Sequence, residues 1–466
     1  MMQNQGLSYQ IYLSVCLSFC SVFSGCSPQS SGSLPISPSA TPTPSVPTLR
    51  LPTPRVPAPS VLAEVNDSES LRLNSLPIDG ASAYVSILDE SREDLFRKGR
   101  GSFLGVLSAL DNIDDIVRRN KARIFRYSFN AAQAYIQNSQ ATGGDIHQER
   151  VQIYTSVNMP VAYNLAFDRV QSPVLIYDRN WMNYSDATLA QNLAQQSYQM
   201  TFAKFANNRL GGGWNTHGNV QEEQMAHQCA DFAVLLAAFN PERHRHQLYT
   251  RKNPVNPSDQ ENAKYSYDGD TADPKLITHL RCFQKLNGNY ERDPRFIYGS
   301  LWAPDGNIDP IVFTAHPDAP AINMIAMAAP ELRLRPNERG VAYPINLAKD
   351  LFNNAYRAFK MVKDYDVQQG YHTHLVLGAW GAGVFGHNLN MSLSMQYLAA
   401  RLVLGDQDQV RFTGMSADRA RTAIQAVDSL IEQSNLSEGA RIPGTHILNE
   451  FLRTHQGQDW HTRGRR

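Results

Sequence analysis

A glycine triplet followed by adjacent acidic residues is the part of this sequence with the clearest capacity for chemistry. Gly211-Gly212-Gly213 comes after an apolar, strand-like run, and Gln221-Glu222-Glu223 follows after a spacer of seven residues. Glycine lets a backbone approach a ligand closely and adopt positive φ angles without strain. A carboxylate beside such a loop can give and accept protons during a reaction. The alternative, from these residues alone, is a turn followed by acidic residues that cap a helix.

A helix is expected to begin near Glu222. Its buried face would carry apolar residues at helical spacing, namely Met225, Cys229, Phe232 and Leu236. Cys229 is therefore interpreted as a core residue and not as a nucleophile. Neighbouring positions on a helix point about 100° apart, so Glu222 and Glu223 are expected to have different tasks.

A second glycine-rich loop extends from Gly378 to Gly386. It lies between the apolar run 374–377 and a predicted helix that has Met391 and Met395 on one face. In α/β proteins, a strand, a glycine loop and a helix in this order bind phosphate, because backbone N–H groups and the helix dipole point at the anion. A simple packing turn is the alternative for the loop taken alone.

Together these segments resemble the macrodomain-type poly(ADP-ribose) glycohydrolases of the bacterial and microbial branch. The first matches their signature loop from Phe205-Ala206-Asn207 to Glu223, and the second resembles their diphosphate loop. That branch usually has Cys where this chain has Ala382, and both residues are small. Residues 323–330 also resemble the family's buried strand. The resemblance covers roughly residues 151 to 410.

The resemblance implies a fold, an activity and a set of site residues. The family cleaves the O-glycosidic bond of a ribose that carries a diphosphate, and by this likeness Glu223 is the acid and base. Glu222 and Asn207 would hold ribose hydroxyls, and Phe385 would pack on the terminal ribose. The remaining implied substrate-binding residues are Gly211, Gly212, Gly213, Gln221, Gly378, Gly381, Ala382, Gly383 and Val384. No cofactor and no metal are implied.

Other functions stay open from the sequence. One is a secreted enzyme that removes single ADP-ribose groups from proteins, which export would favour. Another is a module that binds ADP-ribose without cutting it, although such a module needs no acid at Glu223. The implied partner is thus an ADP-ribose polymer or an ADP-ribosylated protein, and we expect the chain to be a monomer. A surface lipoprotein without a small ligand would leave both glycine loops unexplained.

The elements that must position these residues indicate an α/β fold. Apolar strand-like runs at 174–177, 200–206, 322–328 and 374–377 alternate with amphipathic segments such as 345–362. We expect a macrodomain-like α/β/α sandwich with a mixed sheet over residues 151–435, with a polar insertion at 240–300. Residues 62–150 are expected to form an N-terminal helical accessory subdomain that covers the catalytic part, and 436–466 a loose C-terminal tail.

The beginning of the chain has the pattern of an export signal. The apolar stretch 11–23 within residues 1–26 has signal-peptide length. It leads into Phe23-Ser24-Gly25-Cys26, which resembles the cleavage box of bacterial lipoproteins with Cys26 as the lipidated residue. Residues 27–61 are rich in Pro, Ser and Thr and are expected to form an extended linker. The protein is therefore expected to be exported, either secreted or anchored to a membrane through Cys26.

Composition and residue spacing argue against three other kinds of protein: a general nucleic-acid binder, a disulfide-built scaffold and a metal-binding protein. The 43 basic and 43 acidic residues balance, which argues against a general nucleic-acid binder with a basic surface. Cys229 and Cys282 are the cysteines beyond the leader, and they can form one disulfide but not a disulfide-built scaffold. Four scattered histidines do not have the spacing of a metal-ligand set, namely His217, His227, His244 and His246.

Overall fold

The computed structural model describes residues between 84 and 454, and these belong to one compact unit that spans Glu69–Arg463. The described ranges are 84–142, 149–156, 159, 162, 165–167, 172–180, 184, 186–206, 210–217, 221–239, 250, 272–286, 313–315, 321–329, 345–382, 385–414, 416–433 and 442–454. The predicted signal peptide with Cys26 and the predicted linker at 27–61 lie outside the described residues.

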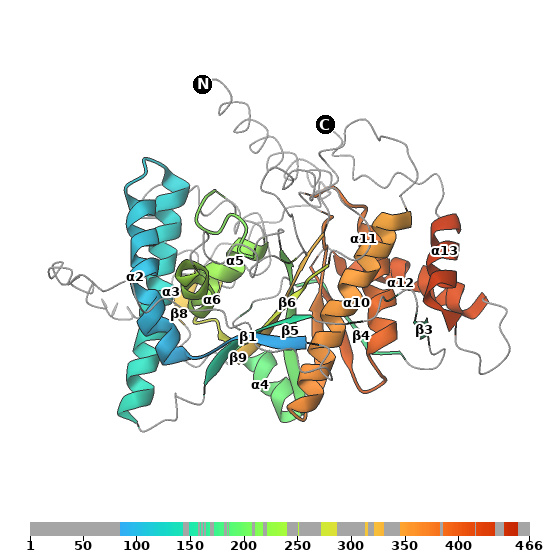
Figure 1. The fold of residues 1–466 in the computed structure, drawn as a ribbon, viewed down its shortest axis with the longest axis horizontal. Coiled ribbons are helices and arrows are strands. Elements are labelled where there is room, and N and C mark those ends of the chain that lie inside the picture. Colours follow the sequence, from blue (N-terminus) through green and yellow to red (C-terminus); the bar gives the residue numbers. More distant parts are fainter. Residues whose placement is uncertain are drawn as a thin grey trace, which may run out of the picture. The chain divides into compact units, whose positions relative to one another are not determined.

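A mixed eight-stranded sheet forms the centre of this unit, in the order β1-β2-β6-β9-β5-β10-β11-β4 (Figure 1). The five strands from β9 to β4 are parallel to one another, whereas β6, β2 and β1 join by antiparallel pairing. The strands are β1 (Tyr84–Ser91), β2 (Arg150–Ser156), β4 (Val174–Asp178), β5 (Tyr198–Ala206), β6 (Lys275–Arg281), β9 (Ala321–Ala328), β10 (His372–Leu377) and β11 (Gln409–Thr413). Short pairs are formed by β3 (Ala166–Phe167) with β12 (Ile442–Pro443), and by β7 (Gln284–Leu286) with β8 (Phe313–Ala315).

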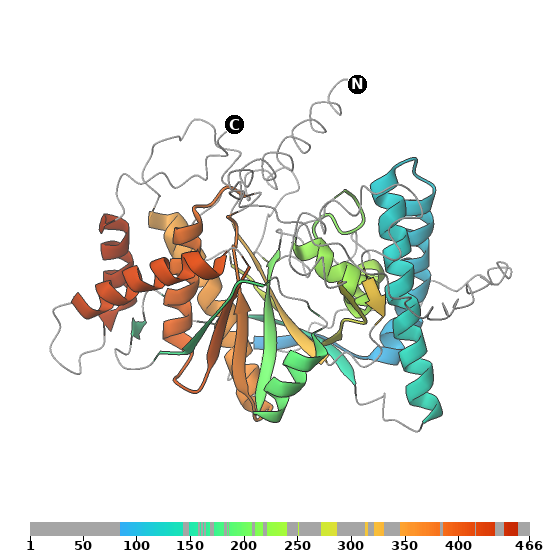
Figure 2. The same cartoon turned by 180° about the vertical axis from the view of Figure 1, so that it is seen from behind.

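Helices cover both faces of the sheet, as the two cartoon views show (Figures 1 and 2). Alternate strand residues serve the two faces: Phe202 and Met324 lie in one hydrophobic core, and Ala203 and Ile325 in the other. The first core contains α2 (Arg92–Asp111), α3 (Ile116–Ala141), α4 (Ala187–Gln195), α5 (Gln221–Gln228) and α6 (Ala230–Ala238). The second contains α10 (Ile345–Gln368), α11 (Leu389–Val403), α12 (Ser416–Gln433) and α13 (Gly444–Thr454).

This layering confirms the predicted α/β/α sandwich with a mixed sheet. The runs expected at 174–177, 200–206, 322–328 and 374–377 are β4, β5, β9 and β10, and the amphipathic segment at 345–362 is α10. Within the described ranges, no helix combines the length and the apolar character that crossing a membrane would require.

The N-terminal part of the unit differs from the expected helical subdomain. Helices are present, but residues 84–91 form β1, which pairs with β2 as an edge of the main sheet. The helices α2 and α3 share a core with α5 and α6, so they belong to the same layer as the candidate site. Helix α2 packs closely against α6 at Gly99, where an added Cβ would lie only 2.6 Å from Val234 Cγ1.

Two further boundaries are corrected by the structure. Residues 275–281, placed in the expected insertion at 240–300, form β6 between β2 and β9. Polar residues such as Thr278 and His279 hid this strand in the sequence. The expected loose tail contains α13, whose Ile447 and Phe451 are buried in the core beside α10 and α12.

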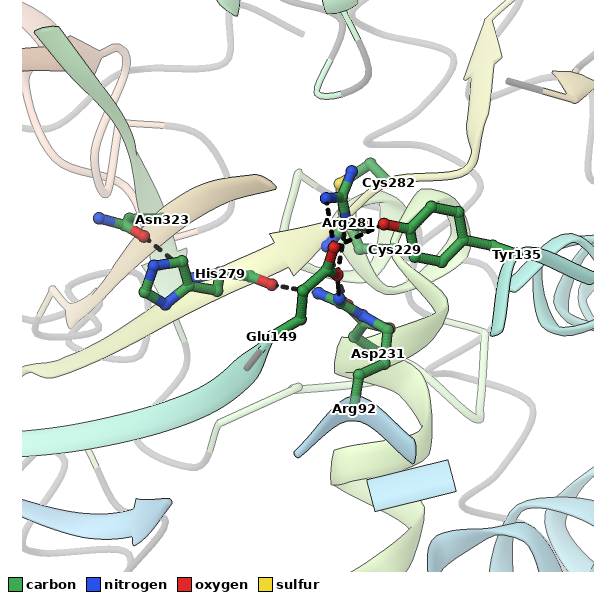
Figure 3. Close-up of polar contacts among 9 residues, drawn as sticks. All are labelled: Arg92, Tyr135, Glu149, Cys229, Asp231, His279, Arg281, Cys282 and Asn323. Carbon is green, nitrogen blue, oxygen red and sulfur yellow. Dashed lines mark hydrogen bonds and ion pairs between the residues drawn. A yellow bond between two sulfur atoms is a disulfide. The ribbon is translucent and has the colours of Figure 1, made fainter. Parts of the chain in front are cut away.

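A partly buried network of charges ties α2 to α6 and β6 (Figure 3). Arg92 donates from Nε to Asp231 Oδ2 at 3.0 Å and also binds Glu149 and the backbone oxygen of His279. Arg281 donates to Glu149 Oε1 at 2.8 Å, and its backbone N–H donates to Asp231 Oδ2 at 2.9 Å. Two arginines thus neutralise two carboxylates beneath the helices.

A disulfide joins the same elements. Cys229 lies between α5 and α6 and is bonded to Cys282, which directly follows β6. Both residues are fully buried. The expectations that Cys229 belongs to the core and that these two residues can form one disulfide are confirmed.

Candidate active site

Both glycine-rich loops leave the same edge of the sheet. The strands β5, β9 and β10 run parallel, with Phe202 opposite both Met324 and Val376. The loop 210–217 follows β5, and the loop 378–387 follows β10. The start of the second loop packs against the end of β5, because a Cβ on Gly378 would lie 3.2 Å from the Phe205 ring.

Gln221 connects the start of α5 to β5. Its Oε1 accepts a hydrogen bond from the Phe205 backbone N–H at 3.0 Å, and its Nε2 donates to the Ala203 backbone oxygen at 2.9 Å. The side-chain amide of Gln221 therefore pairs with two backbone groups of β5 next to the site. A direct role of Gln221 in substrate binding stays a prediction.

Glu222 and Glu223 both turn toward the first glycine loop. Glu222 Oε1 accepts from the Gly211 N–H at 2.6 Å, and Glu223 Oε1 accepts from the Gly213 N–H at 2.9 Å. Both side chains are nearly fully buried. Their helix positions diverge, as expected, but the flexible side chains let both carboxylates reach one loop.

Gly212 occupies the space between the two carboxylates. It has φ +48°, and an added Cβ would lie 2.7 Å from Glu222 Oε2 and 2.9 Å from Glu223 Oε1. Any larger residue would have to displace a carboxylate as well as adopt the left-handed backbone region. Glycine is therefore required at this position for both space and conformation.

Glu222 is paired with a buried lysine that the sequence interpretation missed. Lys204 on β5 donates from Nζ to Glu222 Oε1 at 2.9 Å, and both side chains are buried. The same ammonium lies 3.9 Å from the centre of the Phe232 ring. Burial lowers the pKa of Lys204, whereas Glu222 opposes this effect. A lysine inside an otherwise apolar strand was the signal in the sequence that could have revealed the pair.

Glu223 has a different electrostatic environment. Burial raises the pKa of its carboxyl group, and the neighbouring Glu222 raises it further, whereas Lys121 and the Gly213 N–H act in the opposite direction. A raised pKa is what a carboxyl group needs to donate a proton near neutral pH. Glu222 is thus held in an ion pair with Lys204, and the environment of Glu223 raises its pKa above the ordinary value of a glutamate.

The second glycine loop is anchored from below by α11. Gln396 Nε2 donates to the Gly378 oxygen at 3.0 Å, and Ser392 Oγ donates to the Trp380 oxygen. Gly381 has φ +68°, and a Cβ there would lie 2.7 Å from Ala329 Cβ. These contacts hold the loop against the ends of β9 and β10.

Several implied ligand-binding residues can be placed in this loop. Ala382 follows Gly381, and its N–H donates to the Ala379 oxygen at 3.2 Å. Phe385 packs against the core beneath α11. Asn207, Gly383 and Val384 lie outside the described residues. The roles of all these residues toward a substrate stay predictions.

The histidines near the site have local partners. His217 forms a hydrogen bond with Asp115 at the start of α3, and His227 is buried with its ring centre 5.1 Å from that of Phe125. Over the described ranges, no group of three or more His, Cys, Asp or Glu side chains has an arrangement that could hold a metal ion. His244 and His246 lie outside those ranges.

Comparisons with known proteins give matches among solved structures. No protein-family model and no curated protein matches the chain. The poly(ADP-ribose) glycohydrolase from Thermomonospora curvata is 17% identical, with a TM-score of 0.32 over 55% of this chain and 76% of that one. The enzyme from Deinococcus radiodurans in complex with ADP-ribose is 16% identical, with a TM-score of 0.34 over 55% of this chain and 85% of that one. In fold, this chain is similar to these bacterial poly(ADP-ribose) glycohydrolases.

Proposed function

We propose that this protein is a glycohydrolase that cleaves O-glycosidic ribose bonds of poly(ADP-ribose) and releases ADP-ribose. The observation that carries the proposal is the convergence of two buried carboxylates, those of Glu222 and Glu223, on Gly212. The resemblance of residues 205–223 and 375–388 to that enzyme family supports the choice of substrate.

In the proposed reaction Glu223 is the general acid and base. Its carboxyl group protonates the leaving ribose oxygen, and the glycosidic C–O bond breaks to give an oxocarbenium-like ribose. Water then attacks the anomeric carbon, and the Glu223 carboxylate takes up the proton that the water loses. One carboxyl group thus performs both proton transfers, whereas many glycosidases use two.

Glu222 has the task of orienting the sugar. Its Oε1 is held by Lys204 and by the Gly211 N–H, so its position is fixed before substrate binds. The second oxygen, Oε2, faces the position where a Cβ of Gly212 would lie. A carboxylate oxygen in this place can accept hydrogen bonds from ribose hydroxyl groups.

The loop 378–387 is proposed to hold the diphosphate. It follows β10, the parallel neighbour of β5, and α11 comes next, with the Asn388 side chain capping its first N–H groups. Backbone N–H groups at the start of a helix favour an anion in that position.

The direct test is an assay of the purified full chain with two substrates. Poly(ADP-ribose) and a mono-ADP-ribosylated protein are incubated separately, and released ADP-ribose is identified by mass. Release from the polymer is expected, and the Glu223→Gln variant should slow it by ~10²–10⁴-fold. Release only from the modified protein would instead indicate a mono-ADP-ribosyl-protein hydrolase, and binding without release would indicate a binding module.

A further inference from the structure

The first glycine loop rests on α3, a helix outside the segments that carry the family resemblance. Three contacts define this support. Lys121 Nζ donates to the backbone oxygens of Gly213 at 3.1 Å and Trp214 at 3.3 Å. The Phe125 ring packs edge-on against Trp214 with 5.4 Å between ring centres, and Asp115 pairs with His217.

Lys121 is the contact closest to the chemistry. Its side chain is fully buried, and the residue whose oxygen it binds, Gly213, donates its own N–H to Glu223. The ammonium and the carboxylate are therefore attached to the same residue of the loop. Lys204 is committed to Glu222, so the two lysines serve different carboxylates.

We propose that Lys121 is a positioning residue for Glu223. It fixes the Gly213 backbone and supplies the positive charge that faces the carboxylate once Glu223 has given up its proton. This inference rests on the proposed function for its catalytic meaning, but the shared attachment of Lys121 and Glu223 to Gly213 stands on the contacts alone. It also assigns a task to α3, namely to complete the electrostatics of the site.

The electrostatics of the two groups agree with this geometry. Burial lowers the pKa of Lys121 to about 7, and Glu223 opposes that shift, as an opposite charge does. Lys121 in turn lowers the raised pKa of Glu223. Because the groups are coupled, a change at either one must appear in the titration of the other.

Other ionisable groups lie around Lys121 and Glu223. They are Asp115 and Arg118 at the start of α3, His217 in the loop, Glu222 and His227 on α5, and Lys204 on β5. The experiment therefore changes Lys121 alone, so that these neighbouring groups are the same in every variant.

The test replaces Lys121 by Gln, Met and Arg in the full chain and follows poly(ADP-ribose) hydrolysis against pH. Without the charge, Glu223 keeps its proton to higher pH, so the alkaline limb of the profile should move up by on the order of 1 pH unit. Lys121→Arg keeps the charge and should leave the limb near its original place. Lys98→Gln is the matched control, since Lys98 on α2 pairs with Glu90 of β1 and not with the loop.

A second readout does not need activity. The pKa of the Glu223 carboxyl group is measured by NMR with isotopically labelled glutamate, and its signal is assigned by its loss in Glu223→Gln. A rise of this pKa in Lys121→Gln or Lys121→Met supports the inference even if the parent hydrolyses nothing, in which case the proposed function fails alone. Variants that lose thermal stability but keep the parent pKa would show a merely structural lysine and overturn the inference.

The reciprocal measurement covers the case in which neither neutral variant folds. The Lys121 amine is titrated in the parent and in Glu223→Gln, where removal of the carboxylate should lower its pKa from about 7. An amine that titrates at the same pH in both proteins overturns the inference.

Discussion

Lys204 and Glu222 form an ion pair that is buried from solvent, with 2.9 Å between Nζ and Oε1. The pair links strand β5, which carries Lys204, to the first turn of helix α5, which carries Glu222. Because both charges are removed from water, the cost of burying each one depends on the presence of the other. This dependence can be measured as a change in the free energy of unfolding.

The first prediction concerns this pair. Glu222→Gln should lower the free energy of unfolding by about 3–5 kcal/mol, because it leaves the Lys204 ammonium buried without its anion. Urea unfolding checks the value. The double variant Lys204→Met with Glu222→Gln removes both charges and should recover part of the loss. A double variant less stable than Glu222→Gln would contradict the assignment.

The second prediction separates the tasks of the two glutamates. Glu223→Gln should reduce turnover by ~10²–10⁴-fold, the usual contribution of a general acid and base, with little change in ADP-ribose affinity. Glu222→Gln should lower the rate and the affinity together, because it orients the sugar. Kinetics and calorimetric binding check both. Parent-like turnover in Glu223→Gln would show that another group carries the proton.

The third prediction concerns Gly212. Gly212→Ala should reduce turnover by about 100-fold, because its Cβ would push a carboxylate out of place. Left-handed backbone should add a stability loss of about 1–2 kcal/mol. Gly101→Ala is the control, since an added Cβ in this part of α2 meets nothing within 4 Å. That change should stabilise the protein by about 0.5–1 kcal/mol and leave turnover unchanged.

The fourth prediction concerns the disulfide. Cys229 and Cys282 are 53 residues apart, and closing a loop of this length stabilises the folded state by about 4 kcal/mol in the chain-entropy model. Adding a thiol reductant should therefore lower the melting temperature measured by circular dichroism. The double variant Cys229→Ala with Cys282→Ala should start lower and show no further response to the reductant.

The fifth prediction concerns pH and His374. Burial lowers the pKa of this ring to about 4. Its Nε2 accepts from Arg411 Nε at 3.3 Å, and Nδ1 lies 2.8 Å from Gln409 Oε1, which suits a neutral ring. As pH falls below about 6.5, the unfolded chain takes up the proton first, so folding loses about 2–3 kcal/mol by pH 4.5 from this group.

Urea unfolding at pH 7 and pH 4.5 measures that effect, with His374→Gln as the comparison. Titrating carboxylates affect both proteins alike, so the difference between them isolates the histidine. The variant should lose less stability than the parent on acidification. Equal losses would show that His374 is protonated in the folded state.

Much of the sheet and the first outline of the site could be predicted from local patterns. Apolar runs of strand length identified β5, β9 and β10, and the stripe of apolar residues identified α10. The glycine loops followed two of these strands, and parallel strands bring such loops to one edge. These features depend on neighbouring residues, so the sequence displays them directly.

The strands β1 and β6 could not be predicted in the same way. Each gains its place from pairing with distant partners: β1 with β2 across α2 and α3, and β6 with β9. Polar side chains of β6 have tertiary partners there, as when Arg281 donates to Glu149 Oε1 at 2.8 Å. A short strand with polar residues has no local pattern that distinguishes it from a loop.

The sequence by itself determined which carboxylates, glycines and strands stand next to one another along the chain. Only the tertiary structure decided their charge balance, since Lys204 neutralises Glu222 from β5 and Lys121 reaches the loop from α3. The physical reason is that backbone conformation follows largely from adjacent residues, whereas the cost of burying a charge depends on whichever elements pack around it.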